Sequence, residues 1–122
     1  MDVNTAERIQ IVDLDGIINK FVQLYIENEP FLIIGKANYH GQVLMHILEI
    51  INIPFESEKF SSGIIFPKKQ GELYNVTGMG AASINLPKIK LYDDSFDYRL
   101  SPDKKHLEKL KPHCGEYKIS IF

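Results

Sequence analysis

The chain has 122 residues, of which 44% are hydrophobic and 25% are charged, and its formal net charge is -2. This is the composition of a globular protein, and we expect residues 1–122 to form a single domain. A slightly acidic chain without a run of basic residues has no general attraction for a phosphodiester backbone, so nucleic acid is not an expected partner.

The cysteine content and the start of the chain are used to predict the cellular compartment of the protein. A single cysteine, Cys114, cannot form an internal disulfide, and no apolar stretch reaches the length of a membrane span. The first ten residues, MDVNTAERIQ, contain an early acid and no apolar segment typical of an export signal. We therefore expect a cytoplasmic protein without membrane association.

The first third of the chain predicts three strands. Residues 7–13 form a short apolar run closed by an Asp-x-Asp-Gly turn at Gly16, and residues 20–29 alternate apolar and polar side chains until Pro30. The continuous apolar run of residues 31–35 is typical of a buried strand.

Residues 38–52 predict an amphipathic helix that has Asn38 as its N-cap and ends near Asn52, just before Pro54. On a wheel of 100° per residue, His40 lies in the middle of an apolar stripe, and His46 lies on the outer face. We therefore expect the His40 ring to point toward the core and the His46 ring to be solvated. The stripe comprises Val43, Leu44, Ile47, Ile50 and Ile51.

The remaining sequence predicts more strands and a second helix. Strands are expected at residues 53–60, 63–66, 73–78, 88–92 and 116–122, with a flexible small-residue segment at 79–83. Residues 101–111 predict a helix with Ser101 as N-cap and Pro102 as the first helical residue. This order predicts an α+β fold, a mixed and mostly antiparallel sheet of five to six strands with two helices packed on it.

The start of the first helix favours an anion. Its first backbone N–H groups have no acceptor within the helix, and the helix dipole adds partial positive charge there. The same dipole pushes a histidine toward the neutral imidazole that a general base or nucleophile requires. Lys20 adds a fixed positive charge if its side chain faces the same way. The alternative, which the pattern leaves open, is that His40 is a core residue bonded to a carbonyl and Lys20 a solvated side chain.

Four segments carry a family resemblance along most of the chain: LDGIINKFVQLYI, NYHGQVL, SSGIIFPKKQGELYNVTGMG and EKLKPHCGEYKISIF. In this order they resemble the Janus/Ocnus family of small phosphohistidine phosphatases. The resemblance implies a hydrolase that uses no metal or other cofactor and removes a phosphoryl group from histidine in a protein. It implies that His40 is the catalytic base or nucleophile and that phosphate is bound by Lys20, Tyr39 and the loop residues Gly78, Gly80 and Ala81.

The sequence departs from the family pattern at two positions. Ile64 stands where the family has an arginine, and Gly80 stands where it has a phosphate-binding serine. A second register would give Ser95 the serine's role, but it requires a long insertion. Because losing one donor at a site of developing charge lowers the rate about a hundred- to a thousandfold, the resemblance predicts phosphate binding with weakened or lost turnover.

Two other readings stay open at this point. VDLDG also resembles the first motif of haloacid-dehalogenase-type phosphatases, with Asp13 as nucleophile, Asp15 as acid/base and Mg²⁺ as cofactor, although Asp and Gly also favour a simple β-turn. That reading requires a core with several helical crossovers. A metal site is not predicted, because there are too few well-spaced ligands among the candidates His106, His113 and Cys114.

The third reading is a protein without catalysis that binds or inhibits another protein. The alternating segment EYKISIF at the end of the sequence could lie at a sheet edge and recruit another chain by strand addition, giving a homodimer. The expected partners are therefore a phosphorylated protein or a small phospho-compound, or a second copy of this chain.

Overall fold

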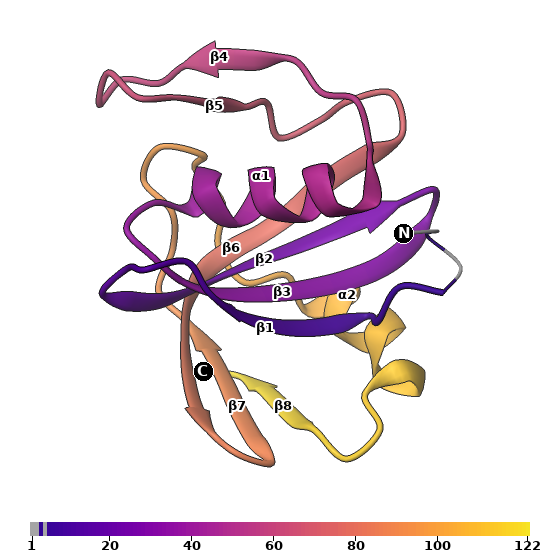
Figure 1. Ribbon diagram of the computed structural model, residues 1–122. Helices are drawn as coiled ribbons and strands as arrows, with labels where there is room; N and C mark the ends of the chain where they lie inside the picture. The colour runs from indigo at the N-terminus through magenta and orange to yellow at the C-terminus, as the bar shows by residue number, and fades with distance from the viewer. Residues whose placement is uncertain (1–2, 4) are drawn as a thin grey trace.

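The computed structural model describes residue 3 and residues 5–122, and its elements alternate as an α+β fold (Figure 1). Residues 1, 2 and 4, part of the segment on which the export-signal expectation rests, lie outside the described residues. The elements are β1 (Ile9–Asp13), β2 (Ile18–Ile26), β3 (Glu29–Ala37), α1 (His40–Ile51), β4 (Ser57–Lys59), β5 (Ile65–Pro67), β6 (Tyr74–Asn85), β7 (Lys88–Tyr92), α2 (Lys104–Leu110), a 3-10 turn (Lys111–His113) and β8 (Lys118–Ile121).

The main sheet has six strands in the order β1-β3-β2-β6-β7-β8. The pairs β1–β3 and β7–β8 are parallel, and the three pairs between them are antiparallel. The short strands β4 and β5 form a separate hairpin that lies over α1 (Figure 1). The predicted α+β architecture, with a mixed and mostly antiparallel sheet and two helices, is confirmed.

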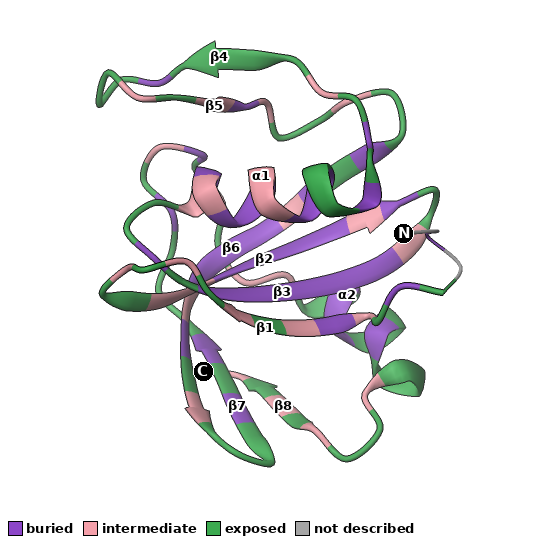
Figure 2. Cartoon of the chain, in the orientation of Figure 1, coloured by how far each residue is buried: buried purple, intermediate pink, exposed green. Residues whose placement is uncertain are grey.

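Alternation along the central strands produces two cores, one on each face of the sheet. In β2, Val22 and Leu24 join the core beneath α1, whereas Phe21 joins the core beneath α2. Both faces of β2 and β3 are buried, as the purple strands of Figure 2 show, which explains why these strands have almost continuous apolar sequences. Within the described part of the chain, no helix has both the length and the apolar character needed to cross a bilayer.

The small-residue segment 79–83 is a strand, which corrects the expectation of a flexible turn. It forms the middle of β6, where Gly80 pairs with Phe21 on β2, and Ala81 pairs with Tyr92 on β7. A side chain at Gly80 would collide with the backbone carbonyl of Tyr92. Small residues are therefore required here by a close approach of strands, a constraint that local propensity cannot reveal.

Helix α1 begins one residue later than expected, with Tyr39 and not Asn38 as its N-cap. The side-chain oxygen of Gln42 accepts hydrogen bonds from the backbone N–H groups of Asn38 and Tyr39, both at 2.9 Å. This reverse capping by the third helical residue fixes the entry of the chain and replaces an Asn38 cap. The predicted C-terminal end at Asn52 is confirmed, since Asn52 is the left-handed C-cap (φ 64°).

The apolar face of α1 is confirmed for four of its five predicted residues. Val43, Leu44, Ile47 and Ile51 are buried, but Ile50 is exposed, so its placement on the stripe was wrong. His46 is half-buried and its Nε2 atom has no partner among the described residues, which corrects the expectation of a solvated ring. The helix is more covered on that side than a wheel predicts because the β4–β5 hairpin packs over it (Figure 1).

Helix α2 begins two residues later than the sequence predicted. Its N-cap is Asp103, whose side chain accepts from the backbone N–H groups of Lys105 (3.0 Å) and His106 (3.3 Å). Ser101 and Pro102 precede the helix, which corrects their predicted roles as cap and first helical residue. The carboxylate of Asp103 accepts two bonds, whereas Ser101 would have capped a helix that starts earlier and does not form.

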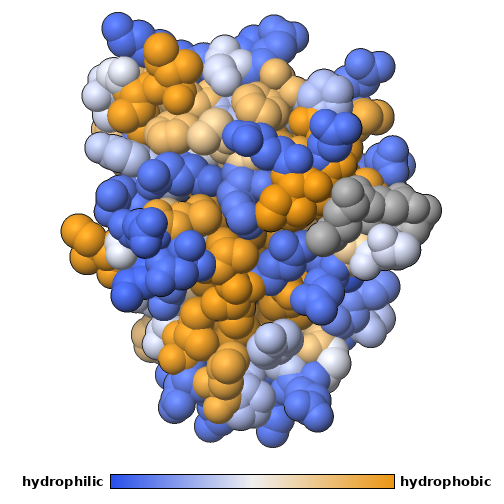
Figure 3. Space-filling model, viewed as in Figure 1, coloured by the Kyte–Doolittle hydropathy of each residue, from blue (hydrophilic) through white to orange (hydrophobic). Residues whose placement is uncertain are grey.

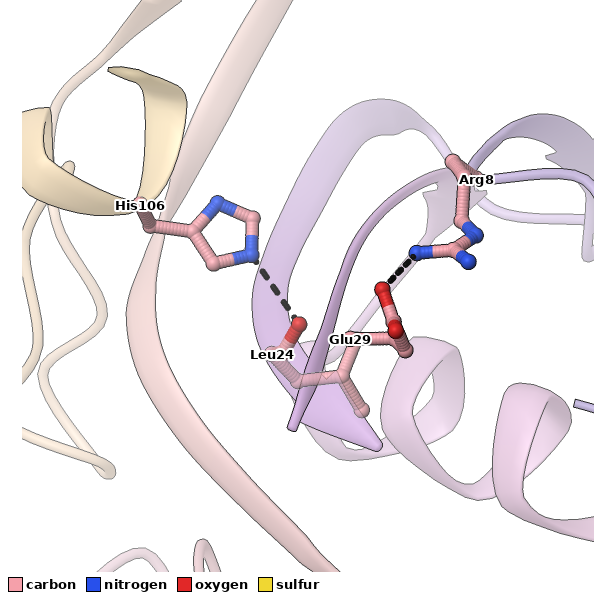
Figure 4. Close-up of polar contacts among 4 residues, drawn as sticks. All are labelled: Arg8, Leu24, Glu29 and His106. Atoms are coloured by element: carbon pink, nitrogen blue, oxygen red, sulfur yellow. Dashed lines mark hydrogen bonds and ion pairs between the residues drawn. The ribbon is translucent and has the colours of Figure 1, made fainter. Parts of the chain in front are cut away.

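A buried polar network fastens α2 to the sheet. His106 is fully buried, its Nε2–H donates to the Leu24 carbonyl (3.0 Å), and its Nδ1 accepts from the side-chain amide of Gln23 (3.3 Å). The same amide also bonds both backbone groups of Asp103, at 2.9 and 2.7 Å. Figure 4 shows the ring aimed from α2 at the Leu24 carbonyl. The hydrogen-bond pattern identifies His106 as a neutral structural residue and not a metal ligand.

The same close-up shows an ion pair near the β1 edge of the sheet. Arg8, before β1, contacts Glu29 at the start of β3 at 2.8 Å (Figure 4). The Arg8 guanidinium also lies over the Phe31 ring, 5.0 Å from its centre. These contacts hold the beginning of the chain against β3.

We predict that His106 makes the protein less stable in acid. Burial lowers the pKa of His106 below the ordinary value, and the Leu24 carbonyl offsets this only in part. Because the folded state then binds fewer protons than the unfolded chain, this stability is fully present above about pH 6.5 and is lost as the pH falls through the folded-state pKa. Urea unfolding measures the free energy of unfolding at pH 7.5 and at pH 5. The difference between these two values should be smaller for His106→Gln than for wild type.

The matched control for this experiment is His113→Gln, which changes an exposed histidine after α2. The loss of pH dependence should be larger for His106→Gln than for His113→Gln. The slope that remains in His106→Gln includes contributions from His40 and His46, since burial lowers the pKa of both rings as well. Equal slopes in wild type and His106→Gln would contradict the assignment.

Candidate functional site

A pocket of about 300 Å³ opens at the N-terminal end of α1. It lies where the start of β2, the start of α1 and the chain after β7 meet (Figure 1). Its walls are formed by Lys20, Asn38, Tyr39, His40, Gly41, Ile64 and the segment 93–98. The structure thus brings together three predicted site residues, Lys20, Tyr39 and His40, from distant parts of the sequence.

His40 is the first residue of α1, and its ring is partly buried. The Nε2–H group donates to the backbone carbonyl of Gly80 on β6 at 2.8 Å. This bond fixes the tautomer and leaves Nδ1 as the ring atom with a free lone pair. Nδ1 has no hydrogen-bond partner among the residues that the structure describes. The ring therefore bonds a carbonyl, as the core reading expected, and it also lines an open pocket.

The electrostatic surroundings keep the His40 ring neutral. Burial lowers its pKa most strongly, the hydrogen bond to Gly80 raises it, and the positive charge of Lys20 lowers it again. Asp93 and Asp97 raise it by smaller amounts. The net effect is a pKa below the ordinary value, so the neutral imidazole is the dominant form at pH 7. A neutral ring with a free Nδ1 is able to accept a proton.

Lys20 faces the pocket because of strand alternation. It lies two residues before Val22 on β2 and therefore points to the same face of the sheet, the face covered by α1. No ion pair joins its ammonium group to any residue in the described part of the chain. The Lys20 side chain therefore faces the start of the helix, as the sequence analysis required for it to add positive charge there.

The helix start supplies two further donors. The backbone N–H groups of His40 and Gly41 belong to the first turn of a 12-residue helix, where no intrahelical acceptor exists. By contrast, the N–H of Gln42 is taken by the Tyr39 carbonyl (3.1 Å). Gly41 is also packed under the Phe66 ring, which leaves no room for a side chain there. The anion-favouring end predicted from sequence is present, shifted by the later helix start.

The opposite wall of the pocket is acidic, and the sequence analysis did not assign its acids to the site of His40. It carries Asp93, Asp94 and Asp97, together with Ser95, the serine of the second register. Ser95 is buried and its hydroxyl accepts from the backbone N–H of Tyr98 at 3.4 Å, so it also shapes the turn. Three acids within five residues after the β7 strand were a visible signal, but their position depends on how β7 pairs with β6.

The predicted phosphate loop at residues 78–81 is not a loop. Gly78, Gly80 and Ala81 belong to β6 and pair with Gln23, Phe21 and Lys20 of β2, and none of the three lines the pocket. The reason is that their small side chains serve strand packing and not phosphate contact. The contribution of this segment to the site is instead the Gly80 carbonyl, which orients His40.

The residues of the other readings lie elsewhere. Asp13 and Asp15 are exposed at the end of β1, where an Asp13 side-chain oxygen accepts from the Asp15 N–H at 2.9 Å in a turn. β1 is an edge strand, which is not the crossover-rich core that an aspartate phosphatase of this kind requires. Among the described residues, no group of three or more His, Cys, Asp or Glu side chains is arranged to hold a metal ion.

A larger open hollow of about 950 Å³ lies between residues 6–9 and residues 113–117. Among the described residues that line it, none is a predicted site residue and none is an unpartnered buried polar side chain. The chemistry of the molecule therefore favours the smaller pocket. No protein-family model matches the chain, and no curated protein matches it.

We predict that the pKa of His40 responds in opposite directions to its two charged neighbours. Lys20→Met removes a positive charge and should raise the His40 pKa, and Asp93→Asn removes a negative charge and should lower it. An NMR titration of the ring Hε1 protons measures both shifts, with His46 in the same spectra as internal control. If His40 titrates identically in the two variants, the three groups are not neighbours in solution.

Proposed function

We propose that the pocket binds a phosphoryl group and that His40 hydrolyses the phosphorus–nitrogen bond of phosphohistidine in a protein. The observation that carries the proposal is the His40 ring, held through Nε2 by the Gly80 carbonyl, with a free Nδ1 beside the unpaired Lys20 and the helix start. A fixed neutral base next to an ammonium group and free N–H donors suits an anionic substrate. The resemblance to small phosphohistidine phosphatases supports the same residues, His40 and Lys20.

The proposed reaction uses water as the nucleophile and requires no metal ion. His40 Nδ1 takes a proton from water while the water oxygen forms a bond to phosphorus. The phosphorus–nitrogen bond breaks, its electron pair stays on the substrate imidazole, and the proton held by Nδ1 passes to that nitrogen. The products are histidine and inorganic phosphate. Lys20 and the N–H groups of His40 and Gly41 stabilise the charge that develops on the phosphoryl oxygens.

The acidic wall favours a nitrogen leaving group over an oxygen leaving group. Asp93 and Asp97 lie close enough to His40 to affect its protonation. Carboxylates at that distance favour the protonated, positively charged form of a departing imidazole, whereas they would repel a departing alkoxide. With Ile64 in place of the family's arginine, one cation fewer faces the phosphoryl group, so we expect slow turnover.

We predict that His40→Ala abolishes hydrolysis of free phosphohistidine and that His46→Ala keeps most of it. The first change removes the only base proposed to act on water, with an expected loss of about a hundredfold or more in kcat. The second removes a half-buried ring of the same helix that does not line the pocket. Phosphate release measures both rates, and circular dichroism checks that both variants are folded. Equal activity of the two variants would defeat the proposal.

The chelator EDTA separates the proposal from the aspartate reading. Wild-type hydrolysis should be unchanged in EDTA, because the proposed reaction has no step that uses a metal ion. Activity that is lost in EDTA and restored by Mg²⁺ would instead favour Asp13 as nucleophile. Asp13→Asn is the matched variant, and it should leave the rate of phosphohistidine hydrolysis at the wild-type value.

A second candidate function is protein association through β8. This strand lies at the edge of the main sheet, and Phe122, directly after it, is 91% exposed. Figure 3 shows apolar side chains gathered over the lower part of the view, where Figure 1 places β7 and β8. An exposed edge with an apolar neighbour suits strand addition by a second copy of the chain. We also propose, for both candidate functions, that the protein is located in the cytoplasm.

We predict, for this second candidate, a concentration-dependent dimer that Ile121→Pro disrupts. The N–H groups of Lys118 and Phe122 bond β7, so alternation points the Ile121 N–H to the open edge, where a proline removes a backbone donor needed for pairing with a second chain. Sedimentation of wild type and variant between about 10 and 500 μM would measure the association. A wild-type chain that stays monomeric over this range would exclude the dimer.

A further inference from the structure

The surface around the pocket carries exposed aromatic side chains. Phe96 lines the pocket and is 83% exposed, and Tyr39 lines it on the side of α1 and is 44% exposed. Tyr39 is held in place by the Phe66 ring, 5.9 Å away between ring centres. Two exposed aromatic side chains that line one pocket are typical of a surface that contacts another macromolecule.

The charges around the pocket are unpaired and mostly negative. Asp93 and Asp94 are exposed, and neither forms an ion pair with a residue in the described ranges. Asp97 bonds the Ser62 hydroxyl through Oδ2 (3.1 Å), but its Oδ1 is buried without a partner in the described part of the chain. Among the residues that the structure describes, Lys20 is the one lysine or arginine that lines the pocket. A partner with positive charge beside its phosphoryl group would complement this wall.

The shape of the surface indicates a chain segment and not an isolated small molecule. The pocket of about 300 Å³ has room for one phosphorylated side chain. A second hollow of about 380 Å³ shares three of its lining residues, Asp94, Ser95 and Phe96, so Phe96 separates two adjacent depressions. Arg99 lines the second hollow and disfavours a cation there, which leaves Asp93 and Asp94 as the acids that face a basic side chain.

We infer that this face docks a basic peptide segment of a partner protein, with its phosphorylated side chain in the pocket, a lysine or arginine neighbour against Asp93 and Asp94, and an apolar neighbour on Phe96. The inference rests on the proposed function for the phosphorylated side chain. It adds the requirement that the residues next to the phosphorylation site are positively charged. Free phospho-compounds lack these contacts and bind more weakly.

Three fluorescent peptides test the inference by anisotropy, without relying on turnover. One carries a hydrolysis-resistant phosphonate analogue of phosphohistidine between lysines, the second carries the analogue between glutamates, and the third has unmodified histidine between lysines. At low salt the first should bind wild type at least about tenfold more tightly than the second, since several exposed charge pairs change sign. Added salt should reduce the ratio of the affinities for the lysine and the glutamate analogue peptides.

Asp94→Asn is the variant that tests the acidic wall, and Glu72→Gln is its matched control. Both remove one negative charge from an exposed side chain, but Glu72 lies before β6, at the end of that strand far from the pocket. Asp94→Asn should lower the preference for the lysine peptide about two- to fivefold, the effect of one exposed charge pair. Glu72→Gln should keep the wild-type ratio.

The outcomes separate the inference from the proposed function. Equal binding of the two analogue peptides, or tighter binding of the glutamate peptide, overturns the inference and leaves the phosphoryl site standing. Equal binding of the analogue and the unmodified lysine peptides supports docking of basic segments and overturns the phosphoryl site. No binding of any peptide overturns the inference, while hydrolysis of free phosphohistidine by the same preparation still decides the proposed function.

Discussion

Alternation along β2 is the constraint on which both the architecture and the site depend. β2 lies in the interior of the sheet, and its successive side chains enter two different cores. The even-numbered positions carry Lys20 toward α1, and the odd-numbered positions carry Gln23 toward α2. A shift of one residue in the pairing of this strand would move the cation away from His40 and the amide away from His106 at the same time.

The two histidines illustrate how similar contacts lead to different roles. Both rings donate through Nε2 to a strand carbonyl, Gly80 for His40 and Leu24 for His106, and burial lowers the pKa of both. The difference is at Nδ1. In His106 this atom accepts from Gln23 and the ring is fully buried, whereas in His40 it is free at an open pocket. Only the second arrangement leaves a base that a substrate can reach.

The pocket carries both positive and negative charge, and this combination restricts the class of substrate that we propose. A site for a simple anion gathers cations, but here Lys20 and the helix start face a wall with Asp93, Asp94 and Asp97. Such a wall raises the free energy of a bare dianion and favours a group that carries phosphate and positive charge together. Phosphohistidine in a basic segment has both. The acids therefore narrow the proposed substrate and do not contradict the phosphoryl site.

The sequence by itself determined what depends on near neighbours along the chain. Periodicity predicted most of the strands and both helices, and the helical wheel placed His40 in the middle of the apolar stripe, because these patterns act within a few residues. The same reasoning failed for the small-residue segment 79–83. A side chain at Gly80 would collide with the Tyr92 backbone, whose position follows from strand pairing and not from local preference.

Tertiary structure alone decided which residues share the pocket. Lys20, His40 and the acids at 93–97 are separated by up to 77 positions, and they meet because β6 pairs with β2 on one side and with β7 on the other. That pairing ends at Tyr92, so the chain leaves the sheet beside the start of α1. Contacts of this range depend on the strand order, and a local pattern contains no information about it.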